Sequence, residues 1–153
     1  MKNELQFRLA TEKDVPKIVG LLADDELGKK REAFKDPLPQ TYYDAFSKIE
    51  ADPNQELTLV FKENELLACF QLSYIQYLTY QGGMRAQIEA VRVNSKYRGQ
   101  GIGKIAFEYA IERAKNKGAH VLQLTTDKKR PEALRFYEGL GFVASHEGMK
   151  IHF

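Results

Sequence analysis

A glycine-rich turn between an expected strand and an expected helix is the segment of this 153-residue chain whose residues most plainly predict chemistry. A branched run at residues 91–93 (VRV) precedes the segment RGQGIGK at residues 98–104. Its alternate glycines leave a row of backbone N–H groups with no Cβ in front of them. A helix N-terminus carries about half a positive charge and up to four unpaired N–H donors. These features together predict a seat for a phosphate or pyrophosphate.

Two familiar phosphate loops do not fit this segment. A nucleoside-triphosphate loop has the pattern G-x-x-x-x-G-K-S/T. Counting back from Gly103, its first glycine would stand where the chain has Arg98, and Ile105 has no hydroxyl for magnesium. A dinucleotide fingerprint, G-x-G-x-x-G, needs a third glycine where the chain has Lys104. Both loops are therefore excluded on spacing.

The spacing that fits is R-x-x-G-x-G, formed by Arg98, Gly101 and Gly103. It resembles the acyl-coenzyme A signature Q/R-x-x-G-x-G/A of the GCN5-related N-acetyltransferase (GNAT) family. The segment ALRFYEGLGF at residues 133–142 resembles the family's A-x-x-F-Y-x-x-x-G-F segment. The two matches stand in the family's order, and the resemblance covers essentially the whole chain. For the six motif residues alone, the alternative is a glycine turn with a plain helix start.

The resemblance implies an α/β fold with a mixed α+β sheet, the GNAT-like acyl-CoA N-acyltransferase fold, in the order β-α-α-β-β-β-α-β-α-β. In this family the sheet splits between the strand before the glycine turn and the strand after it, and acetyl-CoA enters there as a co-substrate. Position in the motifs assigns the coenzyme contacts to Val91, Arg92, Val93, Arg98, Gly99, Gln100, Gly101, Ile102, Gly103, Lys104, Arg130, Ala133 and Phe136.

Several of these residues have specific expected roles. The backbone of Val91 and Val93 can pair with the pantetheine arm as an added strand would, and the Val91 N–H can polarise the thioester oxygen. Arg98 and Lys104 can neutralise phosphates, each charged hydrogen bond contributing ~1.5–3 kcal/mol. Many relatives have an asparagine where this chain has Arg130. A phosphate contact and no role at all both remain open for Arg130.

Acetyl transfer to an amine needs a neutral amine, and a free alkyl ammonium has a pKa of about 10.4. A base is therefore required near neutral pH. Glu89 is the candidate, acting directly or through a water; it shares a strand face with Gln87 because side chains alternate. The alternative is a solvated glutamate. By resemblance, Tyr137 is the acid that faces the coenzyme sulfur; the alternative is an aromatic core residue beside Phe136.

Apolar periodicity predicts the elements that position these residues. A half-buried strand begins at Leu5, and Thr11 is expected to cap the helix that follows. A loop or broken helix is expected at 25–39 and a second amphipathic helix at 42–51. The strand–helix–strand unit around the glycine turn should form a right-handed parallel crossover. The other expected elements are strands at 56–62, 65–77, 84–93, 120–126 and 142–153 and helices at 101–117 and from Pro131 onward.

Length and composition fit a single N-acetyltransferase domain over residues 1–153. The net charge of +2 is too small to imply a nucleic-acid or membrane partner. One cysteine, Cys69, lies in an apolar run and is expected in the core, with no internal disulfide. The three histidines are isolated, so no metal is expected. The chain shows no signal-peptide pattern, which favours a cytoplasmic location.

The expected function is acetyl-CoA-dependent acetylation of a primary amine on a small molecule, by direct attack in a ternary complex. Amino acids, polyamines and aminoalkylphosphonate-like amines all remain open as acceptors. Three segments should line the acceptor pocket: residues 24–42, the strand from Phe70 to Tyr80 and the turn before Met84. The first segment is mixed in charge, acidic at 24–26 and basic at 29–31. The alternatives are a non-catalytic acyl-CoA-binding regulatory module and acetylation of a protein or peptide amine. Pairing into a homodimer also stays open.

Overall fold

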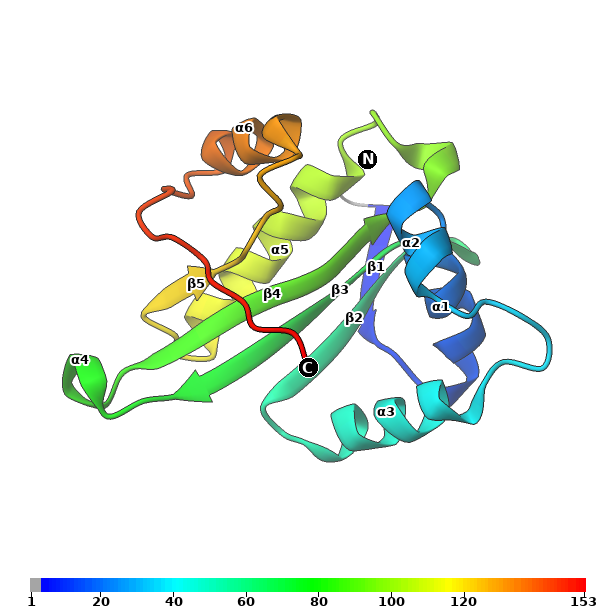
Figure 1. Cartoon of the computed structure of the whole chain (residues 1–153), viewed down its shortest axis with the longest axis horizontal. Helices are drawn as coiled ribbons and strands as arrows, with labels where there is room; N and C mark the ends of the chain where they lie inside the picture. Colours follow the sequence, from blue (N-terminus) through cyan, green and yellow to red (C-terminus); the bar gives the residue numbers. More distant parts are fainter. Residues whose placement is uncertain (1–3) are drawn as a thin grey trace.

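A single five-stranded sheet forms the centre of the computed structural model, which describes residues 4–153 (Figure 1). The strands lie in the order β1-β2-β3-β4-β5; β4 and β5 pair in parallel and the other neighbours antiparallel. The strands are β1 (Leu5–Leu9), β2 (Gln55–Lys62), β3 (Glu65–Gln76), β4 (Met84–Val93) and β5 (Val121–Gln123). The helices are η2 (Glu12–Asp14), α1 (Val15–Leu22), α2 (Glu26–Arg31), α3 (Gln40–Ala51), α4 (Thr79–Gly82), η3 (Ser95–Tyr97), α5 (Ile102–Asn116) and α6 (Pro131–Gly139).

Side-chain alternation along the strands divides the core between two faces of the sheet. Phe70 and Leu72 of β3 pack with Phe107 of α5, whereas Cys69 packs with Ile18 of α1 on the other face. In Figure 1, α5 lies behind β4, and α1 and α2 lie on the front side of the sheet, while α6 lies beyond its upper edge and α3 below it. The face that packs against α5 is called the α5 face below.

The chain enters α1 at the position predicted for its cap. The Thr11 backbone N–H and hydroxyl both donate to Asp14 Oδ2, at 2.8 and 2.9 Å. Arg8 adds two hydrogen bonds of 2.8 Å to the same carboxylate. These donors, Arg8 above all, hold the pKa of Asp14 well below its usual range. The predicted start of the first helix is confirmed, and it opens through the single turn η2.

A partly buried ionic cluster anchors the C-terminal half of α5 to the sheet. The Glu56 carboxylate on β2 accepts hydrogen bonds from Arg113 at 2.8 and 2.9 Å and from the Tyr74 hydroxyl at 3.1 Å. Burial alone would raise the pKa of Glu56, but these donors and the nearby Lys117 outweigh it, so the pKa lies below its ordinary value. The cluster fixes the helix whose other end carries the glycine turn.

A β-bulge interrupts β4 at Ala90, whose φ is 52°. The register with β3 shifts there, so that Ala90 and Val91 together lie opposite Phe70. Ile88 before the bulge and Val91 after it consequently pack on the same α5 face. Cys69 lies beneath the bulge, 3.7 Å from the Ala90 carbonyl, and burial raises the pKa of its thiol to about 12. The prediction that Cys69 is a core residue is confirmed.

The expected strand at 142–153 is wrong. This tail forms no strand, and its residues 143–153 are all exposed, Met149 by 94%. In Figure 1 it passes in front of β4 and β3. The strand expected at 120–126 is shortened to β5, which pairs with β4 through three residues only. A strand needs a ladder partner, and so short a β5 gives the tail little to pair with.

The segment expected as a loop or broken helix at 25–39 contains the short helix α2. Asp25 caps it by accepting a hydrogen bond from the Gly28 N–H at 2.5 Å. No helix within residues 4–153 combines the length and apolar character that crossing a membrane requires.

Candidate active site

The strands β4 and β5 separate at the place where the sequence predicts the coenzyme. Their described ladder runs from Arg85 to Gln87 on β4 and goes no further. On the other edge of β4, the Asn94 N–H donates to Leu67 of β3 at 2.8 Å. Because backbone direction alternates along a strand, the N–H and C=O groups of Val91 and Val93 point to the open side.

The glycine turn has the backbone that only glycine adopts easily. Gly99 and Gly101 have φ of 75° and 80°. A Cβ built on either would meet no heavy atom within 4 Å, so conformation and not crowding requires glycine here. Gly101 precedes α5, and no side chain caps this helix. The predicted uncapped helix start after the turn is confirmed, with its first N–H groups available to an anion.

Asp24, in the turn between α1 and α2, reaches the chain just before the glycine turn. Its Oδ2 accepts a hydrogen bond from the Ser95 N–H at 2.9 Å. Arg98 Nη2 donates to the Asp24 carbonyl at 3.0 Å, and Arg98 Nε donates to the Val93 carbonyl at 3.1 Å. The Ser95 N–H, with the charge of Arg98, holds the pKa of Asp24 below its ordinary value. Arg98, which was expected to contact a phosphate, thus connects the α1–α2 turn at Asp24 to the end of β4 at Val93.

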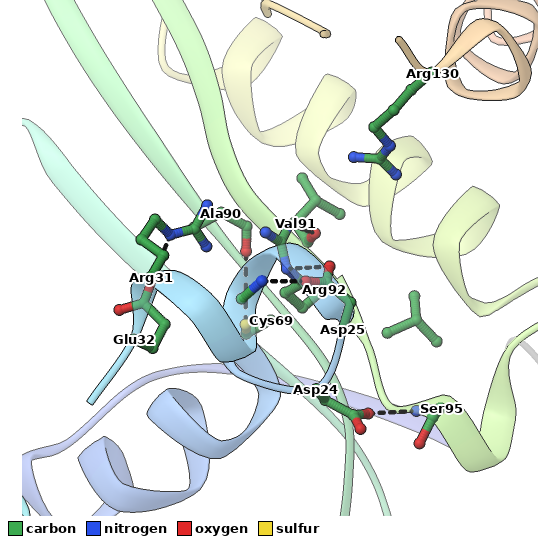
Figure 2. A network of polar contacts seen from close by, with 12 residues as sticks. Asp24, Asp25, Arg31, Glu32, Cys69, Ala90, Val91, Arg92, Ser95 and Arg130 are labelled. Carbon is green, nitrogen blue, oxygen red and sulfur yellow. Dashed lines mark hydrogen bonds and ion pairs between the residues drawn. The ribbon is translucent and has the colours of Figure 1, made fainter. Parts of the chain in front are cut away.

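Arg92 makes the matching connection from the strand itself (Figure 2). Its Nη1 donates to the Val91 carbonyl at 2.8 Å, and its Nε lies 3.6 Å from Asp25 Oδ2. The carbonyls of Val91 and Val93 therefore both accept from arginines. The sequence showed the acidic pair at 24–25 but gave no signal that it contacts the strand before the glycine turn, because that contact spans about seventy residues of chain.

Glu89 lies on the sheet face opposite α5. Gln87 Nε2 donates to Glu89 Oε1 at 2.5 Å, which confirms the prediction that the two side chains share a face. Gln123 of β5 in turn donates to Gln87 Oε1 at 2.9 Å. Glu89 is exposed, and in the sequence it immediately precedes Ala90, where the bulge lies.

Tyr137 lies on the α5 face, in a cluster of aromatic rings. Its ring centroid is 5.5 Å from that of Phe107, 5.6 Å from Phe136 and 6.2 Å from Phe142. Phe136 is the more exposed of the adjacent pair, and a Cβ on Gly103 would lie 3.7 Å from its Cζ. The two candidate catalytic side chains, Tyr137 and Glu89, therefore lie on opposite faces of the sheet.

The other expected coenzyme residues differ in what they offer a ligand. The side chains of Ile102 and Ala133 are buried in the structure, which leaves mainly their backbone. Gln100 Nε2 donates to the Lys96 carbonyl at 3.3 Å. Lys104 is exposed on the first turn of α5. Arg130, immediately before α6, lies apart from the Asp24–Asp25 contacts in Figure 2 and is 4.0 Å from Glu132.

The sequence model of the acetyltransferase (GNAT) family matches residues 22–142. The chain belongs to the GNAT family. This GNAT enzyme is an N-acetyltransferase of the kind that uses acetyl-CoA. It is 29% identical over 142 residues to the aminoalkylphosphonate N-acetyltransferase of Salmonella typhimurium, covering 92% of this chain and 86% of that protein.

Two solved structures extend the comparison for this GNAT protein. A Bacillus halodurans protein described as a transcriptional regulator is 54% identical, with a TM-score of 0.93, and the match covers 97% of this chain and 99% of that one. A Clostridium acetobutylicum protein predicted to be an acetyltransferase, solved with acetyl-CoA, has a TM-score of 0.74 at 20% identity, covering 97% and 96%. The latter likeness concerns the fold alone.

Proposed function

We propose that this GNAT enzyme acetylates the primary amine of a small molecule, which attacks acetyl-CoA directly in a ternary complex. The observation that carries the proposal is the open edge of β4 beside the uncapped start of α5. Acetyl-CoA supplies an activated acetyl thioester. The N–H groups of the glycine turn fit its pyrophosphate, and the strand edge at Val91 and Val93 fits its amide-bearing arm.

Glu89 and Tyr137 divide the proton transfers in this proposal. Glu89 accepts the proton of the acceptor ammonium, directly or through one water, and leaves a lone pair on nitrogen. The Val91 N–H stabilises the negative charge that develops on the carbonyl oxygen. The nitrogen lone pair forms the new carbon–nitrogen bond, the carbon–sulfur bond breaks, and Tyr137 donates its phenolic proton to the departing sulfur. The second proton of the nitrogen is lost to solvent, from which the Tyr137 phenolate takes a proton back. The exposure of Glu89 supports its role, and within residues 4–153 no group hydrogen-bonds the Tyr137 hydroxyl, which supports the other.

The basic residues have two tasks in this proposal. Lys104 and Arg130 are exposed and neutralise phosphates. Arg98 and Arg92 contact Val93 and Val91 and hold the strand edge that the coenzyme meets. This division departs from the expectation that Arg98 serves the phosphates, because its guanidinium already contacts Asp24 and the strand.

A second candidate is an acyl-CoA-binding module that regulates a partner. The description of the Bacillus halodurans relative as a transcriptional regulator favours this second candidate. The fold could persist while the chemistry is lost. In that case acetyl-CoA would bind, but no amine would be acetylated.

Two measurements on the wild-type protein test the proposal. Acetyl-CoA should raise the melting temperature, because a ligand that binds only the folded state stabilises it by mass action, and NADH and ATP should not do so comparably. Free thiol should then appear from acetyl-CoA when primary amines are added. Equal stabilisation by ATP or NADH would contradict the coenzyme assignment. Stabilisation by acetyl-CoA with no thiol release across an amine panel would favour the regulatory module.

A further inference from the structure

The sheet face opposite α5 carries a row of polar side chains that crosses four strands. Cross-strand pairing aligns Gln55 of β2 with Ser73 of β3, Ser73 with Gln87 of β4, and Gln87 with Gln123 of β5. A second pair on this face, Gln71 and Glu89, lies one step nearer the bulge. We define the polar lane as Arg85, Gln87 and Glu89 of β4 with Gln71 and Ser73 of β3.

Hydrogen bonds hold the carboxamides of the polar lane in fixed orientations. Gln55 Oε1 accepts from Gln71 Nε2 and from Ser73 Oγ, both at 2.8 Å. Gln87 accepts from Gln123 and donates to Glu89. The middle of the lane therefore presents uncharged hydrogen-bonding groups, and Glu89 supplies its negative charge.

Arg85 supplies a positive charge at the other end of the polar lane. Its guanidinium carbon lies 4.8 Å from the centre of the Tyr77 ring and 5.4 Å from that of Tyr80. Within residues 4–153 Arg85 makes no ion pair with a carboxylate, and its buried Nε has no hydrogen-bond partner. Its charge is thus positioned by aromatic rings without being neutralised by an acid.

The backbone at Tyr80 and Gln81 is strained, and this turn places the Tyr80 ring beside Arg85. Tyr80 and Gln81 have φ of 54° and 59°, in the left-handed region that side chains rarely adopt. Such conformations cost on the order of 1–3 kcal/mol each and persist where surrounding contacts hold them. The Tyr80 ring contacts His120 at 5.1 Å between centroids, and His120 Nδ1 lies 2.9 Å from the Met84 carbonyl.

We propose that the polar lane binds the acceptor, and that the acceptor is an amine with an anionic group at its far end. This inference rests on the proposed function, in which Glu89 receives the amine. Along the polar lane the side-chain charge is negative at Glu89, zero at Gln87 and positive at Arg85. Two-residue steps along a strand measure about 6.6 Å, so the Cα atoms of Glu89 and Arg85 lie roughly 13 Å apart. An α-amino acid is too short to meet both charges, whereas an extended chain with a carboxylate or phosphonate end matches them.

Four acceptors with six carbon atoms each test this inference on the wild-type enzyme: 6-aminohexanoate, 6-aminohexylphosphonate, hexylamine and 1,6-diaminohexane. Both anionic acceptors should exceed hexylamine in kcat/KM by ~10-fold or more, since a charged hydrogen bond is at stake. The diamine should be the poorest, because Arg85 repels its second ammonium. The ratio between the two anionic acceptors identifies which acid the site prefers. Equal values for all four, or preference for the diamine, would overturn the inference.

Arg85→Gln should remove the preference for the anionic acceptors through a rise in KM. Arg85→Glu should transfer the preference to 1,6-diaminohexane. Lys115→Gln, a matched loss of charge on α5 at the opposite face of the sheet, should leave all four ratios unchanged. If the Arg85 variants do not fold, the wild-type ratios alone decide. If acetyl-CoA binds and no amine reacts, the proposed function fails; if amines react without discrimination by tail charge, only this inference fails.

Discussion

On the α5 face of β4, the groups proposed to meet the coenzyme are mostly main-chain atoms, whereas the opposite face offers side chains drawn from several strands. The first face consists of the edge at Val91 and Val93 and the glycine turn, with Tyr137 as the proposed reactive side chain. The second face carries the polar lane. Backbone atoms recognise what all acyl-CoA molecules share, and side chains can be exchanged without disturbing the fold. Acceptor choice can therefore change while coenzyme binding is kept.

The bulge at Ala90 lets one strand serve both faces. Without it, strict alternation would place Glu89 and Val91 on the same side. With the extra residue, Glu89 faces the polar lane and Val91 faces α5. The Glu89 side chain thereby lies on one face of the sheet and the Val91 side chain on the other, while the Val91 N–H, the proposed oxyanion donor, lies at the open edge between them.

Tyr137→Phe should produce the largest effect, and it falls on the α5 face. The change removes one hydroxyl and keeps the ring among Phe107, Phe136 and Phe142, so packing should change little. If the hydroxyl protonates the departing thiolate, turnover should fall by ~10²–10⁴ with near-normal coenzyme affinity. Single-turnover rates with a fast acceptor check this. Unchanged chemistry in the folded variant would remove Tyr137 from the mechanism.

Gly101→Val tests whether the glycine turn acts through its backbone. A valine at φ of 80° is strained and stands where the pyrophosphate is proposed to bind. Gly118→Val is the matched control, since Gly118 has φ of 93° beyond the far end of α5 and is equally uncrowded. Both should lose similar stability by urea unfolding. Only Gly101→Val should weaken acetyl-CoA binding, by ~10-fold or more; equal affinities in the two variants would refute the phosphate seat.

The sequence predicts the elements of the α5 face well, because the residues that determine them are close together in the sequence. The motif from Arg98 to Lys104 fixes a turn and a helix start through glycine conformation and the absence of a cap, and Pro131 marks the start of α6. The tail at 142–153 was predicted wrongly, since alternating apolar residues such as Met149, Ile151 and Phe153 form a strand only where a neighbouring strand is available to pair with them.

The opposite face could be predicted only in part. The shared face of Gln87 and Glu89 follows from alternation within one strand and is confirmed. The alignment of Gln55 with Ser73 and Gln87 depends on register between strands, which no local pattern encodes. The bulge at Ala90 was also invisible, because alanine carries no turn signal.

Glu89→Gln should have a smaller effect than Tyr137→Phe, because an amine can also lose its proton to solvent. Near neutral pH we expect turnover to fall by ~10-fold. The rate profile should move to higher pH, where the amine deprotonates unaided. Glu112→Gln, an exposed carboxylate on α5, is the control and should leave the profile in place. A Glu89→Gln enzyme with the wild-type profile would leave Glu89 as a solvated strand residue.

Asp24→Asn should have the smallest effect, and it tests how strongly the α1–α2 turn supports the coenzyme face. The Asp24–Arg98 pair is half exposed, and such pairs contribute about 0.2–1 kcal/mol, so acetyl-CoA affinity at pH 7 should fall by at most ~5-fold. Asp44→Asn on α3 should leave affinity unchanged. The Ser95 N–H lowers the pKa of Asp24 in the folded state. The contribution of Asp24 to folding stability is therefore complete above the unfolded-state pKa near 3.9, and it is lost as the pH falls through the lower folded-state pKa. Urea unfolding should therefore show the free energies of unfolding of wild type and Asp24→Asn differing at pH 7 and converging in acid, while isothermal titration with acetyl-CoA at pH 7 measures the loss of affinity. A loss above 100-fold at pH 7 would mean that the turn determines coenzyme binding outright, and the two faces would then not be separable.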